Sequence, residues 1–253
     1  MRNVLIVNDD GIDSSGIRIL AEVFKVGCEV TIIAPLEERS CSSHSLTVFR
    51  DIKYCKQDER VYAISGTPAD CVKIAVIHLG LKPDFVISGI NNGPNLGFDV
   101  MYSGTVAAAA EAVYLGFAGV ALSLGSWTND ELHFKAAANY LYQNKETLYS
   151  MAKDCKKEAL LNINYPCTNT KNCPYEFMGT KVTKAGINWY DDYYESKEVG
   201  ILQLKGTPVL HRLESVDCDV NWVTKGYATI TPLKIDRNHY DLIEKYKDRL
   251  EFR

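Results

Sequence analysis

Short runs of aliphatic and β-branched residues alternate with longer amphipathic segments through the first half of this chain. Residues 4–7, 30–34 and 85–88 are almost entirely apolar, and residues 119–123 have a similar character. Strands covered on both faces by helices have this pattern, so each run predicts a buried strand of a parallel sheet. We therefore expect an α/β fold with a Rossmann-like, doubly wound and mostly parallel sheet in three α/β/α layers.

Amphipathic segments between these runs supply the expected helices. Residues 16–25, 71–79 and 132–152 each place apolar side chains at helical spacing. Thr67 is a typical N-cap and Pro68 a typical first-turn residue, so the second helix should begin there. The third segment is expected to be one continuous helix that closes the first half of the chain.

Periodicity is weaker beyond about residue 160. The expected elements there are β-like segments at 180–183 and 200–204, a strand at 227–233 and a helix at 236–252. The segment from Trp189 to Tyr194 combines aromatic side chains with Asp191 and Asp192. Three roles fit it: a substrate-stacking loop, an arm that packs on a second subunit, or a surface hairpin, which is slightly favoured.

Composition narrows the range of partners. The chain has 253 residues, 46% of them hydrophobic, and a formal net charge of −4. Without a basic stripe it is not expected to bind a nucleic-acid polymer, although a small anion bound locally is compatible with this charge. No apolar run is long enough to span a membrane and no signal pattern opens the chain, so we expect a cytoplasmic protein without membrane contact. Eight scattered cysteines with no C-x-x-C pair indicate reduced thiols rather than disulfides or structural zinc.

An acidic pair follows the first expected strand, in the sequence Asn8-Asp9-Asp10-Gly11. Adjacent carboxylates repel one another unless a cation lies beside them, and hard oxygen ligands suit Mg²⁺ or Mn²⁺. For the pair alone, a ligand site and a solvated turn are equally good explanations.

A stretch suited to phosphate runs from Asn91 through Asn95 to the start of an alanine-rich helix at residues 107–110. Small residues let backbone N–H groups approach an anion, and the hydroxyls of Ser103 and Thr105 add donors at the positive end of that helix. Alone, the run Ser103-Gly104-Thr105 is more typical of an ordinary helix start.

The polar clusters follow the carboxyl ends of successive predicted strands, where open parallel sheets bind their ligands. Asp9 and Asp10 follow the first strand, Arg39 and Ser40 come shortly after the second, and Asn91 ends the strand at 85–88. We therefore expect all three clusters at one edge of the sheet. His44 is an acid–base candidate, but a hydrogen-bonded loop residue is the more common role and no partner is evident along the sequence.

These motifs, in this order, resemble those of a known family. They are Asn8-Asp9-Asp10-Gly11, Arg39-Ser40, Ser45-Leu46-Thr47, Gly66-Thr67-Pro68-Ala69-Asp70, Ser88-Gly89-Ile90-Asn91, and the stretch from Asn95-Leu96-Gly97 to Val106. The chain is similar to the SurE family of metal-dependent 5′-nucleotidases, and the match extends to Gly226-Tyr227 and Thr231-Pro232-Leu233.

The resemblance implies one divalent cation per subunit, Mg²⁺ or Mn²⁺, and hydrolysis of nucleoside 5′-monophosphates, with 3′-monophosphates and short polyphosphate as further substrates. The residues implied are Asp9, Asp10, Ser40 and Asn91 for the metal, and Asn95, Ser103, Gly104 and Thr105 for phosphate. Our candidates for catalysis are Asp9 and Asp10, and our candidates for supporting roles around them are Asn8, Arg39 and His44. The resemblance further implies a single domain over residues 1–253, with a catalytic core at 1–125. From about residue 160 to 253 we expect the C-terminal strands, a β-hairpin arm that assembles a homodimer or homotetramer, and the terminal helix.

Two mechanisms fit these residues: attack by a water that Asp9 or Asp10 orients or deprotonates, and attack by a carboxylate to form an aspartyl-phosphate. A receiver-like signalling module and a non-catalytic nucleotide-binding module are the rivals. A receiver module should end its third strand in a phosphorylatable aspartate, whereas this strand ends in Ser88-Gly89-Ile90-Asn91. A dinucleotide- or P-loop-binding module should carry a Gly-x-Gly-x-x-Gly or Walker motif, and this sequence has neither. One departure from the family is Cys41, where glycine is common, so the local backbone need not be the same if that glycine has positive φ.

Overall fold

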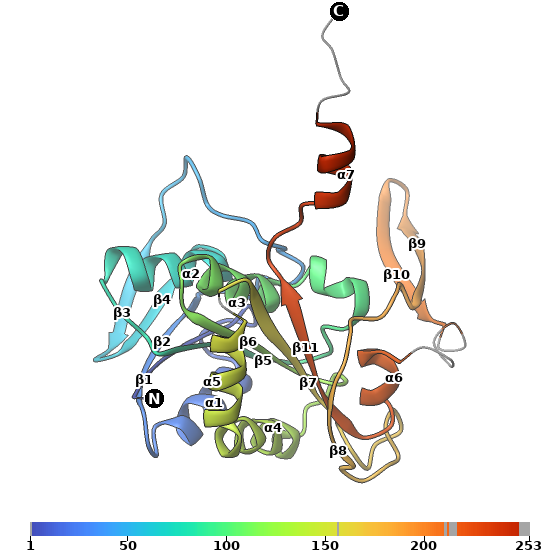
Figure 1. Ribbon diagram of the computed structural model, residues 1–253, viewed down its shortest axis with the longest axis horizontal. Coiled ribbons are helices and arrows are strands. Elements are labelled where there is room, and N and C mark those ends of the chain that lie inside the picture. Colours follow the sequence, from blue (N-terminus) through green and yellow to red (C-terminus); the bar gives the residue numbers. More distant parts are fainter. Residues whose placement is uncertain (1, 156, 210–211, 213–216, 248–253) are drawn as a thin grey trace, which may run out of the picture.

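The structure is a computed structural model that describes residues 2–155, 157–209, 212 and 217–247. A nine-stranded, mostly parallel sheet forms its centre and has the order β3-β4-β2-β1-β5-β6-β7-β11-β8 (Figure 1). In that order the strands are Tyr54–Asp58, Val61–Ile64, Glu29–Pro35, Asn3–Val7, Phe85–Asn91, Ala118–Leu124, Ala159–Tyr165, Tyr227–Lys234 and Gly179–Val182. Only the pairs β3–β4 and β7–β11 are antiparallel in this sheet, so the expected α/β class is confirmed.

Helices cover both faces of the sheet. The helices among the described residues are α1 (Ser15–Phe24), α2 (Pro68–Lys73), the π-helix η1 (Ile74–His78), the 3₁₀ helix η2 (Gly97–Met101), α3 (Gly104–Tyr114), α4 (Glu131–Gln143), α5 (Lys145–Asp154), α6 (Asp219–Val223) and α7 (Tyr240–Tyr246). Of these, α7 extends away from the sheet (Figure 1). Figure 1 shows α1, α4 and α5 on one side of the sheet and α2 and α3 on the other.

Alternation along β1 explains these layers. Val4 and Ile6 pack in the core cluster that contains residues of α1, α4 and α5. Leu5 and Val7 pack instead with α2 and α3. Successive side chains of a strand point to opposite faces, so a fully apolar strand requires helices on both sides. The apolar run at residues 4–7, from which the sequence predicted a doubly wound sheet, thus packs against helices on both faces.

The strand order reverses at β1, which pairs with β2 on one side and β5 on the other. Loops after β1 and β5 thus leave the same edge and diverge, which opens a crevice between them. Asp9 and Asp10 follow β1 and Asn91 ends β5, so the topology brings the predicted clusters together.

Several expected elements differ in detail. The segment 132–152 is two helices rather than one, because the chain turns at Asn144 between α4 and α5. The strands β3 and β4 lie between the second and third expected strands and were not predicted. β3 is largely polar, and β4 is an apolar run of only four residues. The C-terminal helix spans Tyr240–Tyr246 and begins four residues later than expected, because residues 236–239 are not helical. The expected segment from residue 248 onward lies outside the described residues.

A separate two-stranded sheet is formed by β9 (Tyr190–Glu198) and β10 (Ile201–Pro208). It extends away from the main sheet as a hairpin (Figure 1). Most of the segment from Trp189 to Tyr194 belongs to the first strand of this hairpin, and its conformation alone does not choose among the three roles considered for it. Within the described residues, no helix has the length and apolar character needed to cross a membrane.

Candidate functional site

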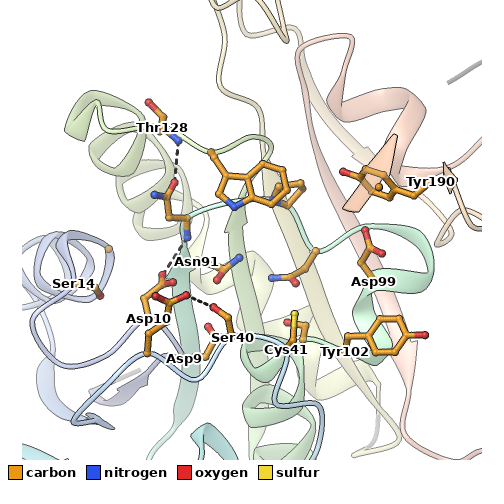
Figure 2. Close-up of a pocket in the computed structure, with 18 of the residues that line it drawn as sticks. Asp9, Asp10, Ser14, Ser40, Cys41, Asn91, Asp99, Tyr102, Thr128 and Tyr190 are labelled. Carbon is orange, nitrogen blue, oxygen red and sulfur yellow. Dashed lines mark hydrogen bonds between the residues drawn. The ribbon is translucent and has the colours of Figure 1, made fainter. Parts of the chain in front are cut away.

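A cavity of about 1330 Å³ lies at the carboxyl edge of the sheet, where the crevice beside β1 opens. Its wall includes Asp9, Asp10, Ser40, Asn91, Asn95 and Ser103, all singled out from the sequence. Figure 2 shows Asp9, Asp10, Ser40 and Asn91 gathered in one part of this cavity. Residues 82 positions apart, Asp10 and Asn92, are joined by a hydrogen bond there. The predicted convergence of the three loops is thus present in the structure.

Asp9 is held by Thr105. The Thr105 hydroxyl donates to Asp9 Oδ1 at 2.5 Å, and the Thr105 backbone N–H donates to Oδ2 at 3.2 Å. Gly104 permits this approach, because a Cβ at that position would lie 3.0 Å from the Asp9 carboxylate oxygen Oδ2 and 2.7 Å from Ser42 Oγ. Both carboxylate oxygens of Asp9 therefore have fixed directions.

Asp10 has a different environment. Its Oδ2 accepts a hydrogen bond from the backbone N–H of Asn92 at 3.2 Å. Burial, reinforced by the neighbouring charge of Asp9, raises the pKa of Asp10 to about 7. Burial also raises the pKa of Asp9, against the hydrogen bonds from Thr105. Two partly desolvated carboxylates side by side create a strong preference for a cation.

Two neutral oxygen donors lie beside this pair. Asn91 Nδ2 donates to the carbonyl of Gly93 at 2.9 Å, which leaves the amide oxygen as its ligating end. Ser40 Oγ donates to Glu38 Oε1 at 2.5 Å, so its hydroxyl oxygen keeps lone pairs for another partner. The backbone N–H of Arg39 donates to the carbonyl of Asp9 at 2.7 Å and ties the Ser40 loop to β1.

The donor set fits a hard divalent cation. Among the described residues, no salt bridge reaches Asp9 or Asp10, so no side-chain cation neutralises them. No cluster of three or more His, Cys, Asp or Glu side chains with metal-binding geometry occurs in this part of the chain. A cation here would accordingly depend on Asn91 and Ser40 as well as on the two carboxylates, and oxygen-only sites of this kind suit Mg²⁺ or Mn²⁺.

An anion-binding side of the cavity is formed at the start of α3. Ser103 caps this helix by accepting from the Val106 N–H at 3.0 Å, so its hydroxyl proton points elsewhere and is available to an anion. Asn95 is nine-tenths buried and is fixed through its backbone by Asn162 and Asn164. Its Nδ2 donates to Ser123 Oγ at 2.8 Å.

Five of the predicted residues do not line the cavity: Asn8, Arg39, His44, Gly104 and Thr105. Gly104 is the first residue of α3, directly after the Ser103 cap. Thr105 is fully buried and bonded to Asp9. Asn8, also fully buried, donates to the carbonyl of Gly11 and to Ser14 Oγ, both at 2.8 Å, and so shapes the turn that carries the acids. Arg39 donates to the carbonyl of Ser65 at 3.1 Å.

His44 has a partner that its sequence neighbourhood did not reveal. Its Nε2 lies 2.8 Å from Glu111 Oε2, and Lys73 Nζ lies 2.8 Å from Glu111 Oε1. Glu111 is buried on α3, 67 residues from His44, and Lys73 is the last residue of α2. The triad ties the loop beyond Ser40 to α2 and α3, so His44 supports that loop.

Cys41 occupies the position where the sequence raised the question of backbone conformation. Its φ is +55°, which is left-handed and unfavourable for a residue with a Cβ. Ser43 has a similar φ of +52°, and its N–H donates to the carbonyl of Tyr102 at 2.9 Å. The Ser40 loop therefore keeps a left-handed turn without glycine.

Sequence reasoning missed a second wall of the cavity. It is made by Trp127, Thr128 and Asn129 of the β6–α4 loop, by Asp99 and Tyr102 near η2, and by Tyr190, Asp192, Tyr194, Leu204, Lys205 and Pro208 of the β9–β10 hairpin. Figure 2 shows Asp99 and Tyr190 on the side away from Asp10 and Ser14. Only the aromatic and acidic composition of residues 189–194 hinted at this.

Burial shifts the pKa values of two side chains on that wall. Burial raises the pKa of the Asp99 carboxyl to about 6. Burial, followed by the charges of Asp99 and Asp192, raises the pKa of the Tyr190 phenol to about 12, so Tyr190 stays a hydrogen-bond donor.

Comparison with known proteins gives a consistent result. The family model described as "Survival protein SurE" matches residues 4–192. The chain is 39% identical to a protein named 5′-nucleotidase SurE from Syntrophomonas wolfei, over 96% of this chain and 93% of that one. It is 36% identical to a protein of the same name from Clostridium botulinum, over 98% and 100% of the two chains. A crystal structure of the SurE protein from Aquifex aeolicus superposes with a TM-score of 0.82 at 33% identity, covering 97% of this chain and 98% of that one.

Proposed function

The chain belongs to the survival protein SurE family, and on that basis we propose that it is a metal-dependent 5′-nucleotidase, which hydrolyses the phosphomonoester of nucleoside 5′-monophosphates. The observation that carries the proposal is the placement of Asp9, Asp10, Asn91 and Ser40 on one wall of a cavity that also contains the Ser103 end of α3. Cation and phosphate would meet there. The receiver-like alternative is not favoured, because β5 ends in Asn91 and the relatives are named as nucleotidases.

We assign the cation to Asp9, Asp10, Asn91 and Ser40, one Mg²⁺ or Mn²⁺ per subunit. When bound, it would neutralise phosphate oxygens and make a water molecule more acidic. Asp9, with both oxygens directed by Thr105, serves as the fixed ligand. Asp10 has one oxygen engaged by Asn92 and the other open to the cavity, so we assign Asp10 the task of orienting the attacking water and holding its proton.

Phosphate binding is assigned to Ser103, Gly104 and Asn95. The Ser103 hydroxyl donates to a phosphate oxygen, and the positive end of α3 at Gly104 adds favourable electrostatics. Asn95 offers the second N–H of its amide, since the first is used by Ser123. These donors would stabilise charge on the equatorial oxygens as the leaving oxygen departs. Thr105, predicted as a phosphate residue, acts instead through Asp9.

The two halves of the chain contribute different parts of the proposed enzyme. Residues 1–125 supply the metal and phosphate residues, whereas the region from about 160 to 253 supplies the hairpin wall and the surfaces for assembly. On the hairpin Val199, Ile201 and Leu202 are exposed apolar side chains, a pattern typical of a subunit contact. We propose that this arm joins a homodimer or homotetramer, which sedimentation equilibrium would measure. All eight cysteines are free, as suits the reducing cytoplasm, where we propose that the protein acts.

The test is phosphate release from a panel of 5′- and 3′-nucleoside monophosphates, short polyphosphate and an aryl phosphate, each with Mg²⁺, Mn²⁺ or EDTA. Asp9→Asn should lower turnover by at least ~100-fold and remain folded. Asp13→Asn is the matched control, because Asp13 is an exposed acid of the same loop that does not line the cavity. Equal activity in EDTA, or a fully active Asp9→Asn variant, would rule out the proposed site.

A further inference from the structure

The cavity is larger than a phosphate and a cation require. Pockets that enclose small molecules are typically ~300–1,000 Å³, and this one reaches about 1330 Å³. The part beyond Asp9 and Asp10 has an aromatic wall that includes Trp127, Tyr102 and Tyr190. The organic part of a phosphomonoester, which is esterified to the phosphate, would therefore extend along aromatic side chains.

Trp127 packs against the backbone of the loop that follows Asn91. A Cβ built on Gly93 would lie 2.5 Å from Trp127 Nε1 and 2.6 Å from Cε2, so the indole rests against the backbone at Gly93. Glycine at this position, with φ +128°, leaves the space that the ring occupies. Gly93 is two residues from Asn91, which places the indole next to the proposed metal site.

Hydrogen bonds hold the chain on both sides of Trp127. The Thr128 N–H donates to Asn92 Oδ1 at 3.0 Å, and the carbonyl of Ser126 accepts from Cys167 Sγ at 3.4 Å. In spite of this anchoring the side chain is 67% exposed. A large aromatic side chain that is held in position and yet open to a cavity is suited to stacking on a planar ligand.

We propose that Trp127 is the stacking platform for the nucleobase of the substrate, and that it makes the enzyme prefer nucleotides over phosphomonoesters without a base. The inference rests on the proposed function, which places phosphate at Ser103 and the cation at Asp9 and Asp10. Asp99, on the same wall, supplies carboxylate oxygens that accept hydrogen bonds from sugar hydroxyls or base amino groups.

Comparing the kinetics of AMP with those of ribose 5-phosphate measures the contribution of the base to catalysis. Trp127→Ala should lower kcat/KM for AMP about tenfold, equivalent to about 1.4 kcal/mol, chiefly through KM. Ribose 5-phosphate, which lacks the base, should change by less than about twofold. Trp127→Phe, which keeps an aromatic face, should retain most of the AMP activity and guards against a folding defect in the alanine variant. An equal loss for both substrates, or unchanged AMP kinetics, overturns the proposal.

Fluorescence provides a readout that does not depend on turnover. Adenosine carries the base but no phosphate, and it should quench tryptophan emission in the wild-type protein and in Trp222→Phe. The Trp222 side chain packs on Tyr227 and does not line the cavity, so this variant is the matched control. In Trp127→Phe the quenching should be lost, whereas ribose should quench none of the proteins. Quenching that survives in Trp127→Phe, or is absent in the wild type, rejects the platform.

The two proposals fail in different ways. A wild-type protein that releases phosphate from neither AMP nor ribose 5-phosphate contradicts the nucleotidase function, and adenosine quenching then decides the role of Trp127 alone. A wild-type protein that hydrolyses both substrates equally well, with no quenching by adenosine, keeps the phosphatase function and removes the base site.

Discussion

Thr105 donates two hydrogen bonds to Asp9, one from its hydroxyl and one from its backbone N–H, across 96 residues of sequence. The first turn of α3 thereby directs a carboxylate at the end of β1. Groups that orient a metal ligand in this way affect metal binding without touching the metal.

Thr105→Val should weaken Mg²⁺ or Mn²⁺ binding, or lower activity, by roughly 10–100-fold, because valine keeps the shape of threonine but lacks the donor to Asp9 Oδ1. Isothermal titration with Mn²⁺ measures the affinity directly. Thr105→Ser is the control, since it retains the hydroxyl and should stay close to wild type. A valine variant with unchanged affinity and turnover would show that Asp9 needs no such support.

Cys41→Gly should stabilise the protein by about 0.5–1 kcal/mol. The left-handed φ of Cys41 costs roughly 1–2 kcal/mol for a residue with a Cβ, and glycine removes that cost while adding some entropy to the unfolded chain. Cys41→Ala keeps the Cβ and should leave the free energy of unfolding nearly unchanged. Urea denaturation of the three proteins makes the comparison, and equal effects of glycine and alanine would contradict the role of the backbone angle.

Alkylation of Cys41 should inhibit the enzyme. Its thiol is exposed and lines the cavity beside Ser40, so a maleimide attached there would occupy the space expected for substrate. Cys55 is also exposed but lies on β3 and does not line the cavity. A Cys41→Ala protein should resist inactivation, whereas Cys55→Ala should be inactivated like wild type. Mass spectrometry identifies the labelled thiol, and full activity with Cys41 modified would exclude its place in the substrate path.

Glu111→Gln should destabilise the protein near neutral pH by about 1–3 kcal/mol, because it removes a buried charge that bonds both His44 and Lys73. Burial alone would raise the pKa of Glu111, but the hydrogen bonds and charges of His44 and Lys73 outweigh it and lower the pKa below its ordinary 4.5. A lowered folded-state pKa means that the stabilisation is complete above 4.5 and is lost as pH falls through the folded value.

The difference in unfolding free energy between wild type and Glu111→Gln should therefore be constant from neutral pH to about 5 and shrink at more acidic pH. Urea titrations at a series of pH values measure it. A difference that grows on acidification would mean that the carboxyl is not held ionised by its partners.

The hydrophobic pattern was sufficient for the central architecture. The runs at 4–7, 30–34 and 85–88 form β1, β2 and β5, because a strand without polar alternation is stable only between two helical layers. Thr67 forms the expected N-cap, with Asp70 completing a capping box, since capping depends on residues only three apart. Interactions between residues so close together in the chain can be predicted from a single sequence.

Helices and strands that depend on contacts with distant parts of the chain were harder to predict from the sequence. Nothing local to 132–152 announced a break at Asn144, and polar edge strands such as β3 acquire their pairing only from β4. His44 likewise had no visible partner, because Glu111 reaches it only after α3 packs beside the loop.

The sequence by itself determined the fold class and singled out Asp9, Asp10, Ser40 and Asn91 as candidates at one edge of the sheet, where the structure brings them together, since strand ends of a parallel sheet face one way. Only the tertiary structure decided that Thr105 directs Asp9, that Gly93 seats the Trp127 indole, and that the β9–β10 hairpin forms the far wall of the cavity. Those relationships join residues far apart in the chain, and side-chain contacts across such distances are set by packing of whole elements rather than by any local pattern.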